Sequence, residues 1–185
     1  MNTSSTSSST AGSGTMVTGL FRDRESAERA YGSASERGYS KDDVNLVMSD
    51  EARKRHFSDG ASAGRETELG TKAAEGAGIG GAIGGTVGAV LAGIAAVGTT
   101  LALPGLGLVI AGPLAAAVAG AGAGAAGGGL VGALIGWGIP EERVKEYESG
   151  IKDGGILMGV RARNDEDASH IESQWRQHNG QNIYR

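Results

Sequence analysis

The sequence predicts an α+β fold, in which helices pack on an antiparallel sheet and a long uncharged segment interrupts the domain. Three observations lead to this prediction. Strand-like and helix-like patterns alternate before residue 58, and they alternate again after residue 140. Between these two regions, residues 76–140 hold 21 of the 34 glycines and contain no Asp, Glu, Lys, Arg or His. We therefore expect the flanks to build one domain and the middle to form a different kind of structure.

The first half of the domain is predicted at residues 16–57. Met16–Phe21 is an apolar run typical of a buried strand. Asp23 suits the N-cap of a helix, and Gly38 suits its C-terminal stop. A second strand is expected at Val44–Met48, which completes a β-α-β unit. The helix face that should pack on the sheet consists of residues at i, i+3, i+4 and i+7, namely Ala27, Ala30, Tyr31 and Ala34.

The second half is predicted at residues 141–185. Pro140 is expected at the first position of a helix that ends at Gly154, because proline has no N–H to lose there. Ile156–Val160 is apolar enough to be a central strand. Asn164 is expected to cap a further helix, and Asn182–Arg185 is expected to be a short edge strand.

Together the two halves predict a ferredoxin-like domain, with β-α-β followed by β-α-β and a four-stranded antiparallel sheet backed by two helices. The two most apolar strands, the first and the third, are expected at its centre. Residues 1–15, rich in Ser and Thr, are expected to be a disordered tail, and residues 58–75 a linker and a lead-in helix. Replacing residues 73–140 with a short Gly/Ser linker is expected to leave a folded domain.

Glycine recurs at every fourth residue along two stretches of the uncharged segment. Residues four apart lie on one face of a helix, so each glycine ladder is a strip along which another helix can approach closely. We expect a glycine-zipper helical hairpin over residues 76–140, with arms at 73–103 and 113–137 and a tip at 104–112. The candidate helix-packing residues are Gly76, Gly80, Gly84, Gly88, Gly120, Gly124, Gly128, Gly132 and Gly136.

The composition of the hairpin leaves two environments open. Each glycine inside a helix costs roughly 0.8 to 1 kcal/mol relative to alanine, so close packing or a bilayer must offset the cost. Either arm is long enough to cross a hydrocarbon core of about 30 Å. The N-terminus has no signal-peptide pattern, so secretion is not expected. We expect either an inner-membrane protein with cytoplasmic flanks or a cytoplasmic protein whose hairpin packs on itself.

Several function classes lack their usual signals. The net charge of −4 gives no footprint for nucleic acid, and the chain has no cysteine. The dinucleotide pattern that begins at Gly76 follows a charged segment rather than a strand. His170, His178 and Glu166 do not complete a metal site, and the acids of residues 141–148 are expected to pair with Lys145 and Lys152. The run Arg53–His56 is interpreted as a solvated helix face. We expect no enzyme, no cofactor and no metal.

Parts of both flanks resemble a known family. The sequence is similar to the bacterial general stress protein 17M-like (heat-induced stress protein) family, which includes relatives labelled low-temperature-induced protein. The resemblance covers residues 16 to about 163 and implies a stress-linked bacterial protein with no catalytic residues to assign. The residues that carry it are Val17–Phe21, Ala27-Glu28, Gly38-Tyr39, the strand from Asp43, Gly138–Glu142 and Tyr147–Leu157.

Two functional hypotheses follow. The first is a non-enzymatic stress-associated protein that associates with a membrane or assembles with itself through the glycine-zipper hairpin. The alternative is a soluble oligomeric regulatory module that binds a small molecule at a ferredoxin-like dimer interface. The expected partners are other copies of the chain and, in the first case, membrane lipid.

Overall fold

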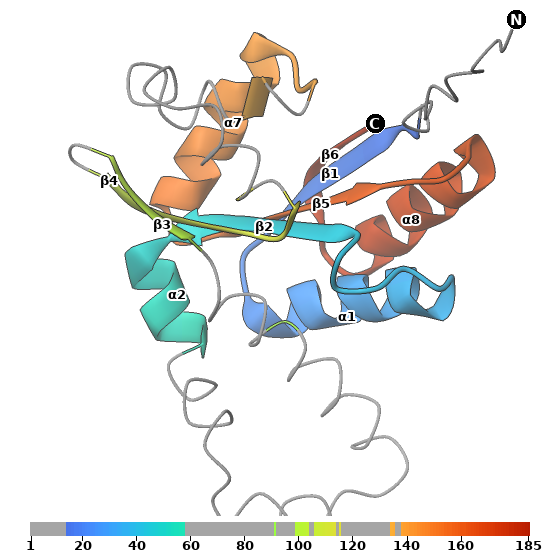
Figure 1. Cartoon of the computed structure of the whole chain (residues 1–185), viewed down its shortest axis with the longest axis horizontal. Coiled ribbons are helices and arrows are strands. Elements are labelled where there is room, and N and C mark those ends of the chain that lie inside the picture. Colours follow the sequence, from blue (N-terminus) through green and yellow to red (C-terminus); the bar gives the residue numbers. More distant parts are fainter. Residues whose placement is uncertain are drawn as a thin grey trace, which may run out of the picture.

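The computed structural model describes residues 14–57, 91, 99–103, 106–113, 115, 134–135 and 138–185. These residues form a six-stranded antiparallel sheet with helices on both faces (Figure 1). The α+β class and the β-α-β units are therefore confirmed. The elements are β1 (Met16–Phe21), α1 (Arg24–Glu36), β2 (Val44–Ser49), α2 (Asp50–Phe57), β3 (Thr99–Leu103), β4 (Leu106–Ala111), α7 (Glu141–Lys152), β5 (Ile156–Arg161), α8 (Asp165–Gln177) and β6 (Gln181–Tyr184).

The elements predicted from the flanks form where expected, and their ends have the expected causes. The side chain of Asp23 accepts from the backbone N–H of Ser26 at 2.7 Å and caps α1. Asn164 caps α8 in the same way, through the N–H of Asp167 at 2.7 Å. Gly38 lies at φ +80° just beyond α1, in a conformation that glycine adopts without strain.

The strand order is β3-β4-β2-β5-β1-β6, with each neighbouring pair antiparallel. The four strands from the flanks are adjacent, in the order β2-β5-β1-β6. β2 was expected at an edge of the sheet, but it pairs with β4 on its outer side. The centre of the sheet is therefore β2 and β5 rather than β1 and β5.

The prediction of a helical arm is wrong for residues 99–103, and most of the predicted tip is a strand. Thr99–Leu103 was assigned to the first helical arm and residues 104–112 to its tip, yet both regions contain strands. The two strands pair in a register that joins Thr99 to Ile110 and Leu103 to Leu106. β4 then extends the sheet, with Leu46 opposite Ala111 and Ser49 opposite Leu108. The strands on both sides of residues 104–105 are thus part of the folded domain.

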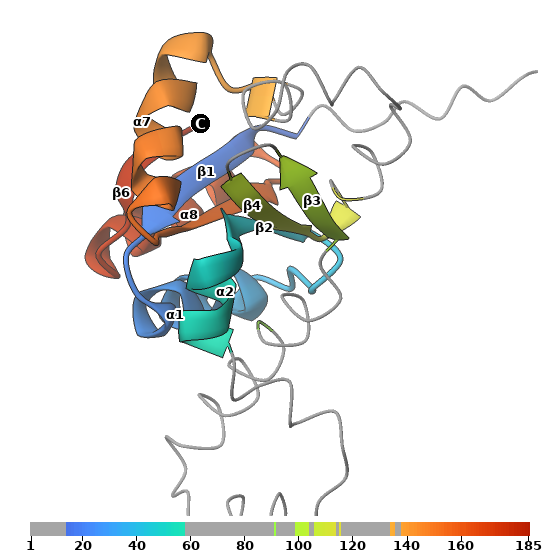
Figure 2. The same ribbon diagram turned by 90° about the vertical axis from the view of Figure 1, so that its left-hand side faces the viewer.

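The sheet is buried on both faces. Helices α1, α2 and α8 cover one face, and α7 covers the other (Figures 1 and 2). Side chains alternate between the two along each strand, so that Met48 and Met158 belong to the first cluster while Val47 and Leu157 belong to the second. This explains why β2 and β5 carry apolar residues on both of their faces.

Helix α7 begins one residue later than predicted. Pro140 is the N-cap, with φ −59° and ψ 143°, and the helix runs from Glu141. Gly154, at φ +91°, follows its end as expected. Within the ranges that the structure describes, no helix is long and apolar enough to cross a bilayer.

Candidate functional site

The nine candidate glycines of the two ladders all lie outside the described residues. Single residues near the ladders are described, and they are informative. Leu91, Ala115 and Leu134 are helical, in agreement with the predicted arms. All three are buried in the domain, with Leu91 and Leu134 fully inaccessible to solvent.

These contacts place Leu91 on one face of the sheet and Ala115 and Leu134 on the other. Leu91 belongs to the apolar cluster under α1, α2 and α8. Ala115 and Leu134 belong to the cluster under α7. The sheet therefore separates the first arm from the return arm at these positions, which a hairpin zipped along its whole length does not predict.

Gly112, which directly follows β4, packs tightly against the backbone of β2. This residue has φ +97°, and a Cβ atom there would lie 2.3 Å from the carbonyl oxygen of Val44. Only glycine fits this conformation and this closeness to β2. Gly138, shortly before α7, has φ +81° and no atom within 4 Å of an added Cβ.

Three of the acidic side chains considered as candidate sites lie in ion pairs. Glu148 accepts from Lys152 at 2.6 Å, as predicted, whereas Glu146 pairs with Arg143 at 3.2 Å rather than with a lysine. Glu166 faces Arg37 at 3.5 Å. Across the described ranges, the structure brings together no group of three His, Cys, Asp or Glu residues able to hold a metal ion.

The basic run of α2 is largely engaged by the domain itself. Asp50 holds Lys54 at 2.7 Å and Arg53 at 2.9 Å, and these hydrogen bonds, that of Lys54 first, lower the pKa of its carboxyl. The imidazole of His56 lies 3.3 Å from the carbonyl oxygen of Gly154. Of these cations, Lys54 is the most exposed, at 71% of its side chain.

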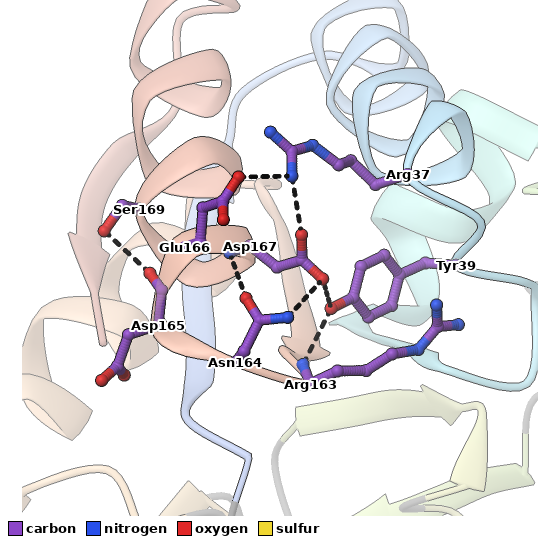
Figure 3. Close-up of polar contacts among 8 residues, drawn as sticks. All are labelled: Arg37, Tyr39, Arg163, Asn164, Asp165, Glu166, Asp167 and Ser169. Atoms are coloured by element: carbon purple, nitrogen blue, oxygen red, sulfur yellow. Dashed lines mark hydrogen bonds and ion pairs between the residues drawn. The ribbon is translucent and has the colours of Figure 1, made fainter.

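The most extensive buried polar contact is centred on Asp167, in the first turn of α8 (Figure 3). Its carboxylate accepts from Arg37 at 2.9 Å and from the hydroxyl of Tyr39 at 2.8 Å. The same hydroxyl accepts from the backbone N–H of Arg163 at 2.8 Å. Burial raises the pKa of Tyr39. Because every partner belongs to the domain, the cluster fastens the loop after α1 to the start of α8.

A second buried polar pair joins α7 to β1. The hydroxyl of Tyr147 lies 3.0 Å from that of Thr18, and it donates to the backbone carbonyl of Asn182 at 2.5 Å. Both Tyr147 and Thr18 are fully inaccessible to solvent. Burial raises the pKa of Tyr147, and the hydrogen bond from Thr18 opposes this in part.

An open cleft of about 460 Å³ lies beside this pair, lined by residues of β1, α7 and β6 and of the loops that follow β1 and α7. Its charged side chains are Arg22, Glu146 and Asp153, and Arg22 also donates to Gln181 at 3.1 Å. The lining is more polar than apolar, which is unlike the apolar pocket expected for most drug-sized ligands. The sequence offered no signal for this cleft because its residues come from three separate elements and the loops beside them.

Comparison with known proteins leaves the function to be argued from these residues. The chain matches no family model, no curated protein and no solved structure. The resemblance to the general stress protein family therefore remains an expectation that depends on the residues quoted for it.

Proposed function

We propose that this protein is a non-enzymatic, stress-associated protein that assembles with itself, and that its glycine ladders are the surfaces through which copies pack. The domain that carries the ladders is proposed to be ferredoxin-like, because β2-β5-β1-β6 is the strand order that two consecutive β-α-β units give in that fold. The association with stress rests on the family resemblance alone.

The burial of Leu91 and Leu134 on opposite faces of the sheet is the observation that carries this proposal. A glycine ladder stabilises a helix only when another helix packs closely against it. With the sheet between the arms at these positions, the matching ladder of the same chain is poorly placed to provide that contact. A ladder from a second copy supplies it instead.

The docked position of β4 also favours assembly over membrane crossing. Each glycine-rich stretch begins and ends on the domain, residues 58–98 between α2 and β3 and residues 112–140 between β4 and α7. Crossing a bilayer and returning takes about 40 residues of helix, at about 20 per crossing. The return stretch is shorter than that, and the uncharged part of the first stretch is residues 76–98. Lipid contact, if present, is then confined to one surface of the bilayer.

The test compares substitutions on and off the ladders. Gly84→Leu and Gly128→Leu each add bulk where helices should touch, and overpacking typically costs 1 to 3 kcal/mol. Ala82→Leu adds one fewer heavy atom, away from the ladder, and is the matched control. We expect the two ladder variants to lower the mass measured by analytical ultracentrifugation, while Ala82→Leu leaves it unchanged. Equal masses for all three variants would contradict the proposal.

Membrane association is tested separately by cell fractionation and a carbonate wash. We expect the wild-type protein to be released by carbonate, since a chain that does not cross the bilayer is held only at its surface. Retention in the washed membrane pellet would instead support insertion, and would require β3 and β4 to leave the sheet.

The polar cleft favours a second candidate function, the binding of a small molecule. Its two carboxylates and one guanidinium suit a polar ligand with an excess of positive charge. Titration calorimetry with spermidine and with citrate provides the test. Spermidine binding that is weakened by Asp153→Asn would support a ligand site, and heat from neither probe would argue against it.

A further inference from the structure

β3 forms one edge of the sheet, and its outer side has no strand partner within the described residues. An edge strand presents a row of unpaired N–H and C=O groups to which another strand can add. Natural edges are usually blocked by charged side chains, proline, a bulge or very short length. β3 has the sequence Thr-Thr-Leu-Ala-Leu and carries no charge and no proline.

The opposite edge of the same sheet is blocked. β6 has four residues, and its register against β1 shifts between Thr18 and Leu20. Asn182, within β6, has φ +49°, which bends the strand away from the extended conformation. Arg185 follows directly and adds a charge. The sheet therefore has one blocked edge, at β6, and one open edge, at β3.

We propose that a second copy of the chain adds its own β3 to this edge, antiparallel and around a two-fold axis, so that two sheets become one. A two-fold axis sets each residue of the strand opposite a residue of the same strand, which is unfavourable when side chains carry like charges. No charge occurs anywhere in residues 76–140, so this penalty is absent.

The composition of the insertion after β4 favours a second copy over these residues of the same chain as the occupant. Residues 116–133, the longest run outside the described part after β4, are almost entirely Gly and Ala. Strands are depleted in both residue types and enriched in β-branched ones such as the two threonines of β3. This contact is distinct from the glycine ladders and does not depend on the function proposed above.

The absence of cysteine from the chain makes the contact directly measurable. Directly opposed residues of antiparallel strands have Cα atoms about 4.5 to 5.5 Å apart, within the range of about 4.4 to 6.8 Å that a disulfide spans. Three single-cysteine variants, Thr100→Cys, Leu101→Cys and Ala102→Cys, cover the central registers. Gln181→Cys, at the blocked edge, is the matched control.

Under mild oxidation, we expect at least one β3 variant to give several-fold more disulfide-linked dimer than Gln181→Cys. Dimer yields no higher than that of the control for all three variants would overturn the proposal. To separate this contact from the ladders, the best β3 variant is combined with Gly128→Leu. An unchanged dimer yield shows that the β3 contact is an independent interface. A yield that falls to the control level shows that the β3 contact requires the ladders, and this result contradicts the inference.

A charge-reversal pair tests the same contact without cysteine. The double variant Thr100→Lys/Ala102→Lys and the double variant Thr100→Glu/Ala102→Glu each place like charges at the two-fold axis. Each alone should lose β3 association, and an equimolar mixture should recover it as a heterodimer. Failure of the mixture to associate, with both variants folded by circular dichroism, would also overturn the proposal.

Discussion

At the scale of single residues, two glycines near the ends of the return stretch differ in their surroundings. Gly112 and Gly138 both have positive φ, but an added Cβ meets the backbone of Val44 at Gly112 and open space at Gly138. Left-handed backbone costs a non-glycine residue roughly 1 to 2 kcal/mol. The two positions therefore differ in the atoms that an added Cβ would meet, and not in the sign of φ.

We predict that Gly138→Ala lowers the free energy of unfolding by about 1 to 2 kcal/mol, the cost of left-handed backbone alone. Gly112→Ala should lower it further, because β4 must move away from β2 to relieve the clash. Urea denaturation measures both values. Hydrogen exchange at the β2 amides that point toward β4 should accelerate in Gly112→Ala alone. Equal effects of the two variants would show that β4 is not docked on β2.

The buried hydroxyl of Tyr147 predicts a dependence of stability on alkaline pH. Burial raises its pKa above the usual value of about 10, so the folded state resists ionisation longer than the unfolded state does. The stabilisation is complete below the unfolded pKa and is lost as pH rises through the raised folded pKa. Urea midpoints between neutral and strongly alkaline pH should therefore fall above about pH 10.

Tyr147→Phe removes this ionisation and should make the alkaline fall less steep. Some fall should persist, because burial also raises the pKa of Tyr31 and of Tyr39. The variant should be less stable at neutral pH, since the buried hydroxyl of Thr18 and the carbonyl of Asn182 lose a partner. An unchanged alkaline slope would mean that Tyr147 ionises equally in both states.

At the scale of elements, α7 approaches β1 closely because Gly150 has no side chain. An added Cβ would lie 2.1 Å from a methyl carbon of Leu20, which is buried at 4% exposure. Alanine would favour the helix by roughly 0.8 to 1 kcal/mol, but overpacking costs roughly 1 to 3 kcal/mol. The packing term should therefore dominate while Leu20 is present.

We predict that Gly150→Ala destabilises the wild-type protein and is neutral or stabilising in the Leu20→Ala background. A double-mutant cycle by urea denaturation gives the coupling, expected at about 1 to 3 kcal/mol. Additive effects of the two substitutions would show that α7 has room to shift away from β1.

Local sequence patterns were sufficient for the elements that have local causes. Capping residues such as Asp23 and Asn164 determine where helices begin, and alternating apolar residues determine strands. β3 and β4 were missed because a segment that is apolar on every side has no amphipathic period to distinguish strand from helix. Two signals were present, the β-branched pair at Thr99 and the turn-forming Pro104-Gly105 between apolar runs.

The placement of α7 is a different kind of omission. Its start near Pro140 and its end at Gly154 were predicted, but the face of the sheet that it covers was not. The near-continuous apolar run of β5 indicates burial on both faces, which requires helices on both sides. As for the candidate site, the sequence identified the ladder glycines, whereas the cleft and the open β3 edge depend on contacts between distant elements.

At the scale of the whole molecule, the insertion is only partly separable. Residues 106–111 fill the outer side of β2, and Leu108, Ile110 and Ile139 belong to the cluster under α7. Replacing residues 73–140 as a block would remove these side chains and leave β2 as an open apolar edge. We therefore no longer expect a stably folded domain after that replacement.

We predict that replacing residues 60–88 and 117–132 with short Gly/Ser linkers leaves a cooperatively folded protein, because β3, β4, Leu91 and Leu134 are retained. The variant in which residues 73–140 are replaced as a block should unfold at a lower urea concentration and aggregate. Urea denaturation and sedimentation of the two variants compare them directly. Similar behaviour would show that β4 contributes little to the domain.

The position of β4 in the sheet also bears on the order in which the chain folds as it emerges from the ribosome. β5, the partner of β2 on its inner side, is synthesised some hundred residues after β2. β4 emerges about halfway through that interval and gives β2 its first long-range partner. A nascent chain that has exposed residue 111 can therefore shield one side of β2, long before the strand that completes the centre of the sheet has been translated.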